Sequence, residues 1–332
     1  TEELVELGKT VRDGEGIFSF HMRSEGTHLI EAIREVIEVC RRSNASVQIS
    51  HLKTSGQEAW GLLGDALRII SGAIAENLPV SCDRYPYTAS NTGLQAVLPK
   101  WVFEGGATEK LRRLRNPATR ARIVSELRLP DRPPTEWERV VISRVNTSSN
   151  KRLEGRSVAE AARIRRMEPE PFVLDLLAEE EALVDAILFT MSEENLREIL
   201  RQPFVMIGSD AAARAPEGIL AQGKPHPRAF GTFARVLGLY ARDERVLDLA
   251  TAIRKMTSLP CAKVGLRSRG AIRPGYWADL VLFDPRTIRD TANYANPISF
   301  PEGIEFVIVN GQITVEHGTH LGTRAGKVLK KG

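Results

Sequence analysis

The sequence has few of the residues that mark disulfide-rich or membrane-spanning proteins. Its 332 residues include three cysteines, an odd number at distant positions, which argues against a disulfide framework and for a reducing compartment. No apolar run approaches the roughly 20 residues that a membrane helix needs. No signal-peptide pattern opens the sequence either. We therefore expect a cytoplasmic protein with no membrane partner.

An excess of charge of one sign is also missing. The 46 basic residues nearly balance the 42 acidic residues, so the formal net charge is only +4. The basic residues are scattered and have no aromatic residues between them, as on solvated helix faces rather than on a nucleic-acid surface. The sequence thus predicts no nucleic-acid partner. Its 42% of hydrophobic residues suffice for one large or two ordinary domains.

Strand and helix patterns alternate along much of the chain. Hydrophobic alternation predicts four strands, at residues 16–21, 47–52, 79–83 and 204–209. The segments between the first three have amphipathic helical spacing and are joined by short connections. Such alternation is typical of parallel βαβ units, so we expect an α/β fold.

Two regions interrupt this alternation. One is charged, rich in proline and mostly helical, and the other is a series of short β segments with a hairpin signal at Asn310-Gly311. We therefore expect barrel-type βα units at 1–103 and 184–269, an insertion subdomain at 104–183, and a β-rich carboxy-terminal part at 270–332.

Three of the predicted strands end in side chains that can bind metal: His21, His51 and Asp210. In βα architectures the ligand site lies at the carboxyl ends of the strands. Neutral imidazoles bind zinc, and a carboxylate can bind metal or serve as a general base. The set is consistent with a metal hydrolase. The alternative is that all three are polar caps, since no tight motif such as HExxH occurs.

Cationic and phenolic side chains occur near the same strand ends. Lys53 follows the second strand, Arg84 and Tyr85 follow the third, and Arg228 comes after Asp210. Such groups suit a carboxylate, which arginine binds in bidentate fashion. We therefore expect a small-molecule substrate that carries a carboxylate.

Seven segments, in chain order, resemble the D-aminoacylase (N-acyl-D-amino-acid deacylase) family of the amidohydrolase superfamily: FSFHMRSEG, QISHLK, DRYPYTASNTGL, FVMIGSD, HPRAFGTF, KMTSLPCAKVGL and GAIRPGYWADLVLFD. The resemblance implies a (β/α)8 barrel of the TIM type with a small β-sandwich. It also implies zinc-dependent hydrolysis of the amide bond of N-acyl-D-amino acids. The residues that it implies are His21 and His51 as metal ligands, Asp210 as catalytic acid and base, and Lys53, Tyr85, Ser90 and Arg228 as substrate-binding residues.

The resemblance covers only the carboxy-terminal two thirds of that family. The family's amino-terminal third carries barrel strands one to four, the first sandwich strands, a His-x-His pair and a bridging cysteine ligand, none of which this chain has. We therefore expect a partial barrel of strands five to eight, an insertion subdomain and part of a β-sandwich. Asp210 is also followed by Ala211, where such enzymes usually have glycine.

Two other functions stay open. A cyclic-amide hydrolase of the dihydroorotase or hydantoinase type would have the same fold, although a carboxylate-binding set argues against a neutral ring as substrate. The chain could instead be a non-catalytic half-barrel, either a degenerate remnant or one subunit that needs a separate partner. The possible partners are the missing amino-terminal segment and, in a homo-oligomer, another copy of the chain.

Overall fold

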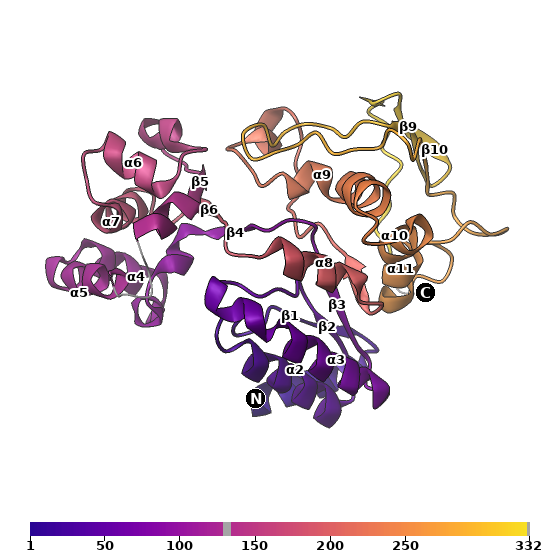
Figure 1. Ribbon diagram of the computed structural model, residues 1–332, viewed down its shortest axis with the longest axis horizontal. Helices are drawn as coiled ribbons and strands as arrows, with labels where there is room; N and C mark the ends of the chain where they lie inside the picture. Colours follow the sequence, from indigo (N-terminus) through magenta and orange to yellow (C-terminus); the bar gives the residue numbers. More distant parts are fainter. Residues whose placement is uncertain (129–133, 331–332) are drawn as a thin grey trace.

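The computed structural model describes residues 1–128 and 134–330. Three parts can be followed in Figure 1: a parallel sheet with its helices near the amino terminus, a helix-rich lobe, and a carboxy-terminal part with a second group of helices and an antiparallel sheet. Residues 129–133, inside the predicted insertion, and the last two residues of the predicted β-rich part lie outside the described residues.

The parallel sheet has the strand order β1-β2-β3-β7. Its strands are β1 (Ile17–Phe20), β2 (Ser46–Ile49), β3 (Val80–Arg84) and β7 (Val205–Ile207). The helices packed beside it are α1 (Glu2–Asp13), α2 (Leu29–Ser43), α3 (Leu63–Ala75), which follows the 3-10 turn η1 (Gln57–Leu62), and α8 (Glu193–Arg201). All three strand pairings are parallel, which confirms the predicted parallel sheet.

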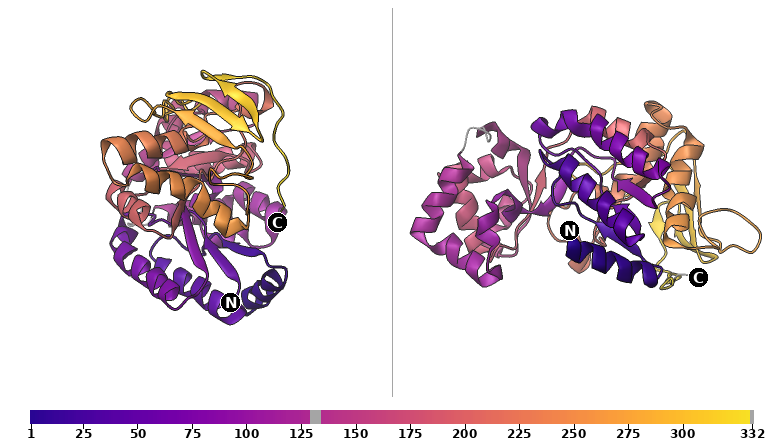
Figure 2. Two further views of the ribbon diagram at one scale, coloured as in Figure 1. Left: turned by 90° about the vertical axis from the view of Figure 1, so that its right-hand side faces the viewer. Right: turned by 90° about the horizontal axis from the view of Figure 1, so that it is seen from below.

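One face of this sheet is apolar and packs on the helices, as Figure 2 shows for α1 to α3. Val47 and Ile49 of β2 are fully buried there, against the apolar side of the amphipathic helix α2. The other face is polar: Ser19 and Ser50 share a hydrogen bond of 2.8 Å. Parallel sheets are normally covered on both faces, so this polar face is the unusual one.

The helix-rich lobe contains a three-stranded antiparallel sheet of order β4-β6-β5. The elements of the lobe are β4 (Ser90–Gly93), η2 (Leu94–Val97), η3 (Lys100–Phe103), α4 (Gly106–Arg115), α5 (Pro117–Leu127), η4 (Pro134–Arg139), β5 (Val140–Arg144), η5 (Ser148–Leu153), α6 (Val158–Ile164), α7 (Pro169–Glu179) and β6 (Asp185–Leu188). It has a hydrophobic core separate from that of the parallel sheet.

Strand β6 belongs to this lobe, although its residues fall in the range 184–269 that we assigned to barrel-type units. It pairs antiparallel with both β4 and β5. A short apolar run such as β6 fits any buried strand, so its hydrophobicity does not reveal which sheet it joins. The sheet of the lobe therefore extends beyond the predicted insertion on both sides.

The carboxy-terminal part begins with helices and ends in a sheet of order β11-β10-β9-β8. Its elements are η6 (Gly218–Ala221), α9 (Arg228–Arg235), the π-helix η7 (Val236–Asp243), α10 (Leu249–Met256), α11 (Ser258–Val264), β8 (Leu280–Phe283), β9 (Ile304–Val309), β10 (Gln312–Glu316) and β11 (Thr319–His320). The expected hairpin is confirmed, with positive φ angles of 49° at Asn310 and 80° at Gly311. None of the helices in the described residues has the length and hydrophobicity to cross a membrane.

Two lysines, Lys255 (buried) and Lys263 (half-buried), join α10 and α11 to the amino-terminal ends of the parallel strands. Lys255 is 0% exposed, and its Nζ donates to the carbonyl oxygens of Val205, at 2.8 Å, and Gln202. Lys263 donates to Ser46 and to the carbonyl oxygen of Val47, both at 2.8 Å. These bonds satisfy carbonyl groups at the base of β2 and β7 and so fix the sheet on its helices.

We expect Lys255→Met to lower the free energy of unfolding by about 1–3 kcal/mol, because two buried carbonyl groups lose their donor. Urea denaturation followed by circular dichroism measures the change. The matched control is Lys9→Met on the surface of α1, which should change stability by no more than about 0.5 kcal/mol. Equal stabilities of the two variants would contradict the role of Lys255.

Candidate active site

His21 and His51 meet at the carboxyl ends of two neighbouring strands. β1 and β2 are paired in register from Ile17 with Ser46 to Phe20 with Ile49, so the residues that follow them emerge side by side. Nδ1 of His21 lies 2.9 Å from Nε2 of His51, and the rings meet edge to face. The structure thus brings together two predicted ligands that are 30 residues apart in the sequence.

Asp83, which the sequence analysis did not single out, holds His51 in place. Its Oδ1 accepts the backbone N–H of His51 at 2.9 Å, and its Oδ2 accepts from Gln48 at 2.6 Å. His51 has a positive φ of 41°, a conformation that is costly for a residue with a side chain. Residues held in such conformations cluster at functional sites.

Glu25 is a second residue that we did not predict. Its Oε1 lies 2.9 Å from Nδ1 of His51 and accepts from Nζ of Lys53 at 2.5 Å. Burial alone would raise the pKa of Glu25, but its hydrogen bond with His51 and the charge of Lys53 lower the pKa to about 2. Glu25 is therefore an anion. Its place four residues after His21, in the same strand-to-helix connection, was the available sequence signal.

The residues present fit a divalent metal such as zinc. His21, Glu25 and His51 offer ligand atoms that all lie within 4.8 Å of one another. Two nitrogens bound to one tetrahedral zinc ion lie about 3.4 Å apart, so the observed 2.9 Å needs only a small rotation of the rings. Burial lowers the pKa of His21, which favours the neutral imidazole that binds metal. Nδ1 of His51 lies 2.9 Å from Glu25 and 2.7 Å from Nζ of Lys53, so Nε2, which faces His21, is the nitrogen available to a metal.

Asp210 follows β7, at the edge of the same sheet, and also has a positive φ, of 49°. Its Oδ2 lies 2.8 Å from Nη1 of Arg228, the first residue of α9. The contact is an ion pair rather than an aligned hydrogen bond, because Nη1 has no hydrogen-bond partner of suitable geometry among the described residues. The Asp210 side chain is 38% exposed, so a small molecule can reach it. The negative charge of Asp210 also raises the pKa of His21, against the larger lowering by burial.

The predicted cationic residues lie around the ring of Tyr85. The guanidinium carbon of Arg84 lies 4.2 Å from the ring centroid, that of Arg228 lies 4.6 Å away, and Nζ of Lys53 lies 5.9 Å away. Within residues 1–128 and 134–330, no hydrogen-bond partner reaches the buried Tyr85 hydroxyl. Lys53 already donates to Glu25 and to the carbonyl oxygen of His51, so Tyr85 and Arg228 have more capacity for a new acceptor.

His226, two residues before Arg228, is a third residue that we did not predict. It is 2% exposed and donates from Nε2 to the carbonyl oxygen of Ala89 at 3.0 Å. Its Nδ1 accepts the backbone N–H of Arg228, also at 3.0 Å. Burial and the charge of Arg228 lower the pKa of His226 to about 3, so the ring is neutral.

Ser90, the remaining predicted residue, lies in a different setting. It is the first residue of β4 and pairs with Leu188 of β6 in the helix-rich lobe. Its link to the other residues is Ala89, whose carbonyl group binds His226. The structure therefore places Ser90 at the border between the lobe and the strand ends.

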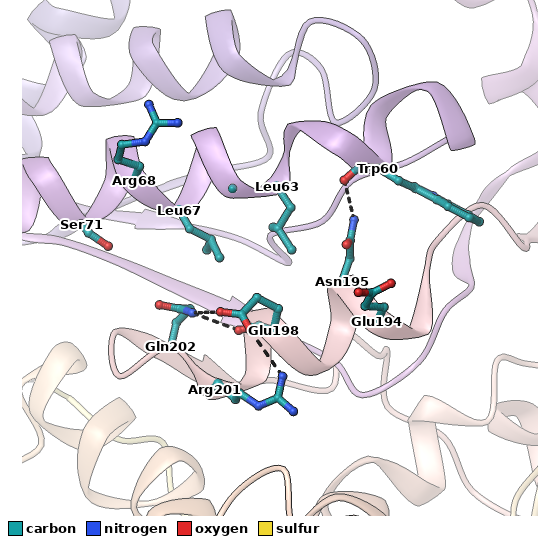
Figure 3. A pocket seen from close by; sticks show the side chains of 11 residues that line it. Trp60, Leu63, Leu67, Arg68, Ser71, Glu194, Asn195, Glu198, Arg201 and Gln202 are labelled. Atoms are coloured by element: carbon teal, nitrogen blue, oxygen red, sulfur yellow. Dashed lines mark hydrogen bonds and ion pairs between the residues drawn. The ribbon is translucent and has the colours of Figure 1, made fainter.

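A groove of about 560 Å³ lies elsewhere, between α3 and α8 on the helical side of the parallel sheet (Figure 3). Asn195 of α8 crosses it and donates to the carbonyl oxygen of Trp60 at 2.8 Å and to Thr54 at 2.9 Å. Since Thr54 follows Lys53 directly, Asn195 helps to hold the connection that carries Lys53.

A sequence profile of the amidohydrolase family matches residues 13–315. The chain belongs to the amidohydrolase family. Among curated proteins, it is 34% identical to a D-aminoacylase of Alcaligenes xylosoxydans xylosoxydans over 331 residues. That alignment covers 100% of this chain and 58% of the relative. The family resemblance seen in the sequence is thus confirmed, and the chain spans little more than half the length of the relative.

Two solved amidohydrolases have similar structures. A crystal structure of a D-aminoacylase matches with a TM-score of 0.78 and 33% identity, covering 98% of this chain and 58% of the other. An N-acyl-D-glutamate deacylase from Bordetella bronchiseptica, complexed with zinc and a phosphonate inhibitor, matches with a TM-score of 0.75 and 27% identity. That match covers 94% of this chain and 56% of the other.

Proposed function

We propose that this protein hydrolyses the amide bond of N-acyl-D-amino acids with the help of a bound zinc ion. The observation that carries the proposal is the meeting of His21 and His51, 2.9 Å apart, at the carboxyl ends of adjacent parallel strands. The deacylase relatives, one of them a zinc complex, support the substrate class and the metal. The Tyr85 hydroxyl has no hydrogen-bond partner in the part of the chain that the structure describes, and the Arg228 guanidinium lies over the Tyr85 ring. Both features favour a substrate with a carboxylate over a neutral cyclic amide.

The metal would be held by Nδ1 of His21 and Nε2 of His51. When bound, it would polarise the acyl carbonyl group and lower the pKa of water toward neutrality. The protein's own part is orientation: Asp83 fixes the backbone of His51, and Glu25 faces Nδ1 of its ring. Such outer partners of a ligating histidine set its tautomer and its direction.

Asp210 would serve as general base and then as general acid. A water molecule adds to the acyl carbon as Asp210 takes one of its protons. The C–N bond then breaks as Asp210 returns this proton to the leaving nitrogen, which gives a carboxylate and a D-amino acid. The ion pair with Arg228 holds Asp210 until the carboxylate of the substrate competes for the arginine.

The strand arrangement suggests how much of the protein this chain represents. We propose that β1, β2, β3 and β7 are strands five to eight of a TIM-type barrel, because they form a parallel sheet whose second face is polar. We keep the proposed division into barrel units, insertion and partial β-sandwich, with the lobe extended to include β4 and β6. The three unpaired cysteines favour a cytoplasmic location.

Alanine at His21 or His51 should abolish hydrolysis and remove most of the bound zinc, because each change deletes a ligand atom. Metal analysis of the protein coexpressed with the amino-terminal segment of a related deacylase, together with turnover of a panel of N-acetyl-D-amino acids, tests both effects. His317→Ala, which changes an exposed histidine, is the control and should keep its zinc. Full zinc occupancy in the double variant would show that the ligands are elsewhere.

Asp210→Asn should lower kcat by a factor on the order of 10² to 10⁴ while zinc stays bound, because the amide cannot accept the proton of water. Steady-state kinetics and metal analysis on the same preparation separate the two effects. Near-normal turnover would mean that Asp210 is a loop cap and that another group moves the proton.

Arg228→Met should weaken binding of N-acyl-D-amino acids by roughly 1.5–3 kcal/mol, since a charge-assisted hydrogen bond is lost. The corresponding amides, which have no carboxylate, should be bound almost as before. Inhibition constants of both ligand types for the variant and the unaltered protein give the comparison. Equal losses for acid and amide would refute the carboxylate site.

A sheet of four barrel strands leaves β1 and β7 as open edges, which favours self-association. We expect the isolated chain to self-associate or to be inactive. Coexpression with the amino-terminal segment of a related deacylase should give a compact species that contains zinc. Analytical ultracentrifugation, calorimetry and metal analysis test this. A monomeric, cooperatively melting and active chain on its own would disprove it.

A further inference from the structure

His226 is a buried residue outside the predicted site, only 2% exposed, and both nitrogens of its ring have partners. Both ring nitrogens form hydrogen bonds of 3.0 Å, one to Ala89 and one to Arg228. A carbonyl oxygen can only accept and a backbone N–H can only donate, so the proton must be on Nε2 and Nδ1 must be bare. The two bonds thus fix the tautomer and the orientation of the ring.

Each of the two bonds ends beside a residue of the proposed substrate site. Arg228 is the first residue of α9, and its guanidinium group faces both Asp210 and the ring of Tyr85. Ala89 immediately precedes Ser90 and β4. Although Ala89 and His226 are 137 residues apart in the sequence, the imidazole ties the start of α9 to the start of β4.

Aromatic rings pack against His226. The rings of Tyr87 and Tyr294 meet it edge-on, with centroids 5.1 and 5.2 Å away. Tyr294 lies in the connection between β8 and β9, so all three parts of the chain meet at this imidazole. Arg228, Arg84 and Arg235 all act on the ring with positive charge, which disfavours a second proton on it.

We infer that His226 is a positioning residue for the substrate carboxylate: it sets the backbone of Arg228, and thereby the place of the guanidinium group, relative to Tyr85 and Ser90. This inference rests on the proposed function, because it assigns His226 to the carboxylate site of that reaction. It predicts that substrate binding depends on the hydrogen bond to Arg228 more than on the volume of the ring.

Two substitutions separate these contributions. His226→Phe keeps a ring of similar size and loses both hydrogen bonds. His226→Asn loses the ring, but its side-chain oxygen can still accept the N–H two residues ahead, as asparagine does in Asx turns. Packing alone would make asparagine the more harmful change, because it leaves a cavity. Positioning would make phenylalanine the more harmful change for substrate binding.

The experiment uses the chain coexpressed with the amino-terminal segment of a related deacylase. It measures kcat, KM, zinc content and melting temperature for both variants, with the best substrate of the N-acetyl-D-amino acid panel and with its amide. His226→Phe should raise KM for the acid about 10-fold or more, with kcat and zinc nearly unchanged and little effect on the amide. His226→Asn should have the lower melting temperature but a KM within about threefold of the unaltered protein. His317→Phe and His317→Asn, at an exposed histidine, should change none of these values.

The inference is overturned if both variants have unaltered KM, if asparagine raises KM more than phenylalanine, or if acid and amide are affected alike. These results would leave the proposed function intact, since the unaltered protein would still hydrolyse the panel. If the unaltered chain, coexpressed with the amino-terminal segment of a related deacylase, hydrolyses no member of the panel, the proposed function is wrong, and the role of His226 in it is wrong as well.

Discussion

The carboxylate of Asp83 is the contact on which the candidate site depends. It joins two adjacent strands beyond their backbone pairing, because one oxygen binds the His51 N–H and the other binds Gln48. A left-handed conformation at a residue with a side chain costs roughly 1–2 kcal/mol, and a hydrogen bond to a charged group contributes about 1.5–3 kcal/mol. The bond therefore offsets the strain at His51. Without this turn, the imidazole would not face His21.

The charges of the site are arranged in opposite pairs. Glu25 faces Lys53, and Asp210 faces Arg228. Unpaired charges are costly in partly buried positions, so this pairing stabilises the protein in the absence of ligand. The Asp210–Arg228 pair also favours anionic ligands. An anion that binds Arg228 replaces the carboxylate of Asp210 as the partner of the guanidinium group. A neutral ligand has no such exchange available.

The sequence was informative where the pattern is local. Strand alternation placed His21, His51 and Asp210 at strand ends, and the Asn-Gly pair identified the hairpin between β9 and β10. These features depend on neighbouring residues along the chain. The chemistry of the cationic residues near these strand ends indicated a carboxylate ligand, and the family resemblance then selected Lys53, Tyr85, Ser90 and Arg228 as substrate-binding residues.

The sequence was uninformative where the contact is long-range. Asp83 is 32 residues from His51, and His226 is 137 residues from Ala89, so neither pairing leaves a periodic trace. The same limit applies to β6, whose apolar residues suit a parallel or an antiparallel sheet equally well. Glu25 differs, since it is near His21 in sequence and was overlooked for lack of a known ligand spacing.

The pairing of β4 with β6 has a mechanical consequence. The chain enters and leaves the helix-rich lobe through two hydrogen-bonded neighbours, Ser90 opposite Leu188. One of these tethers leads back to Ala89, which His226 holds, and the other leads on to Thr190, whose carbonyl oxygen binds Gly56 and Trp60. A rotation of the lobe would therefore displace both the segment around Ala89 and the segment around Thr190. Because the two ends of the lobe lie side by side, at Ser90 and Leu188, the lobe can be replaced by another insertion without a change in length of the other connections in the chain.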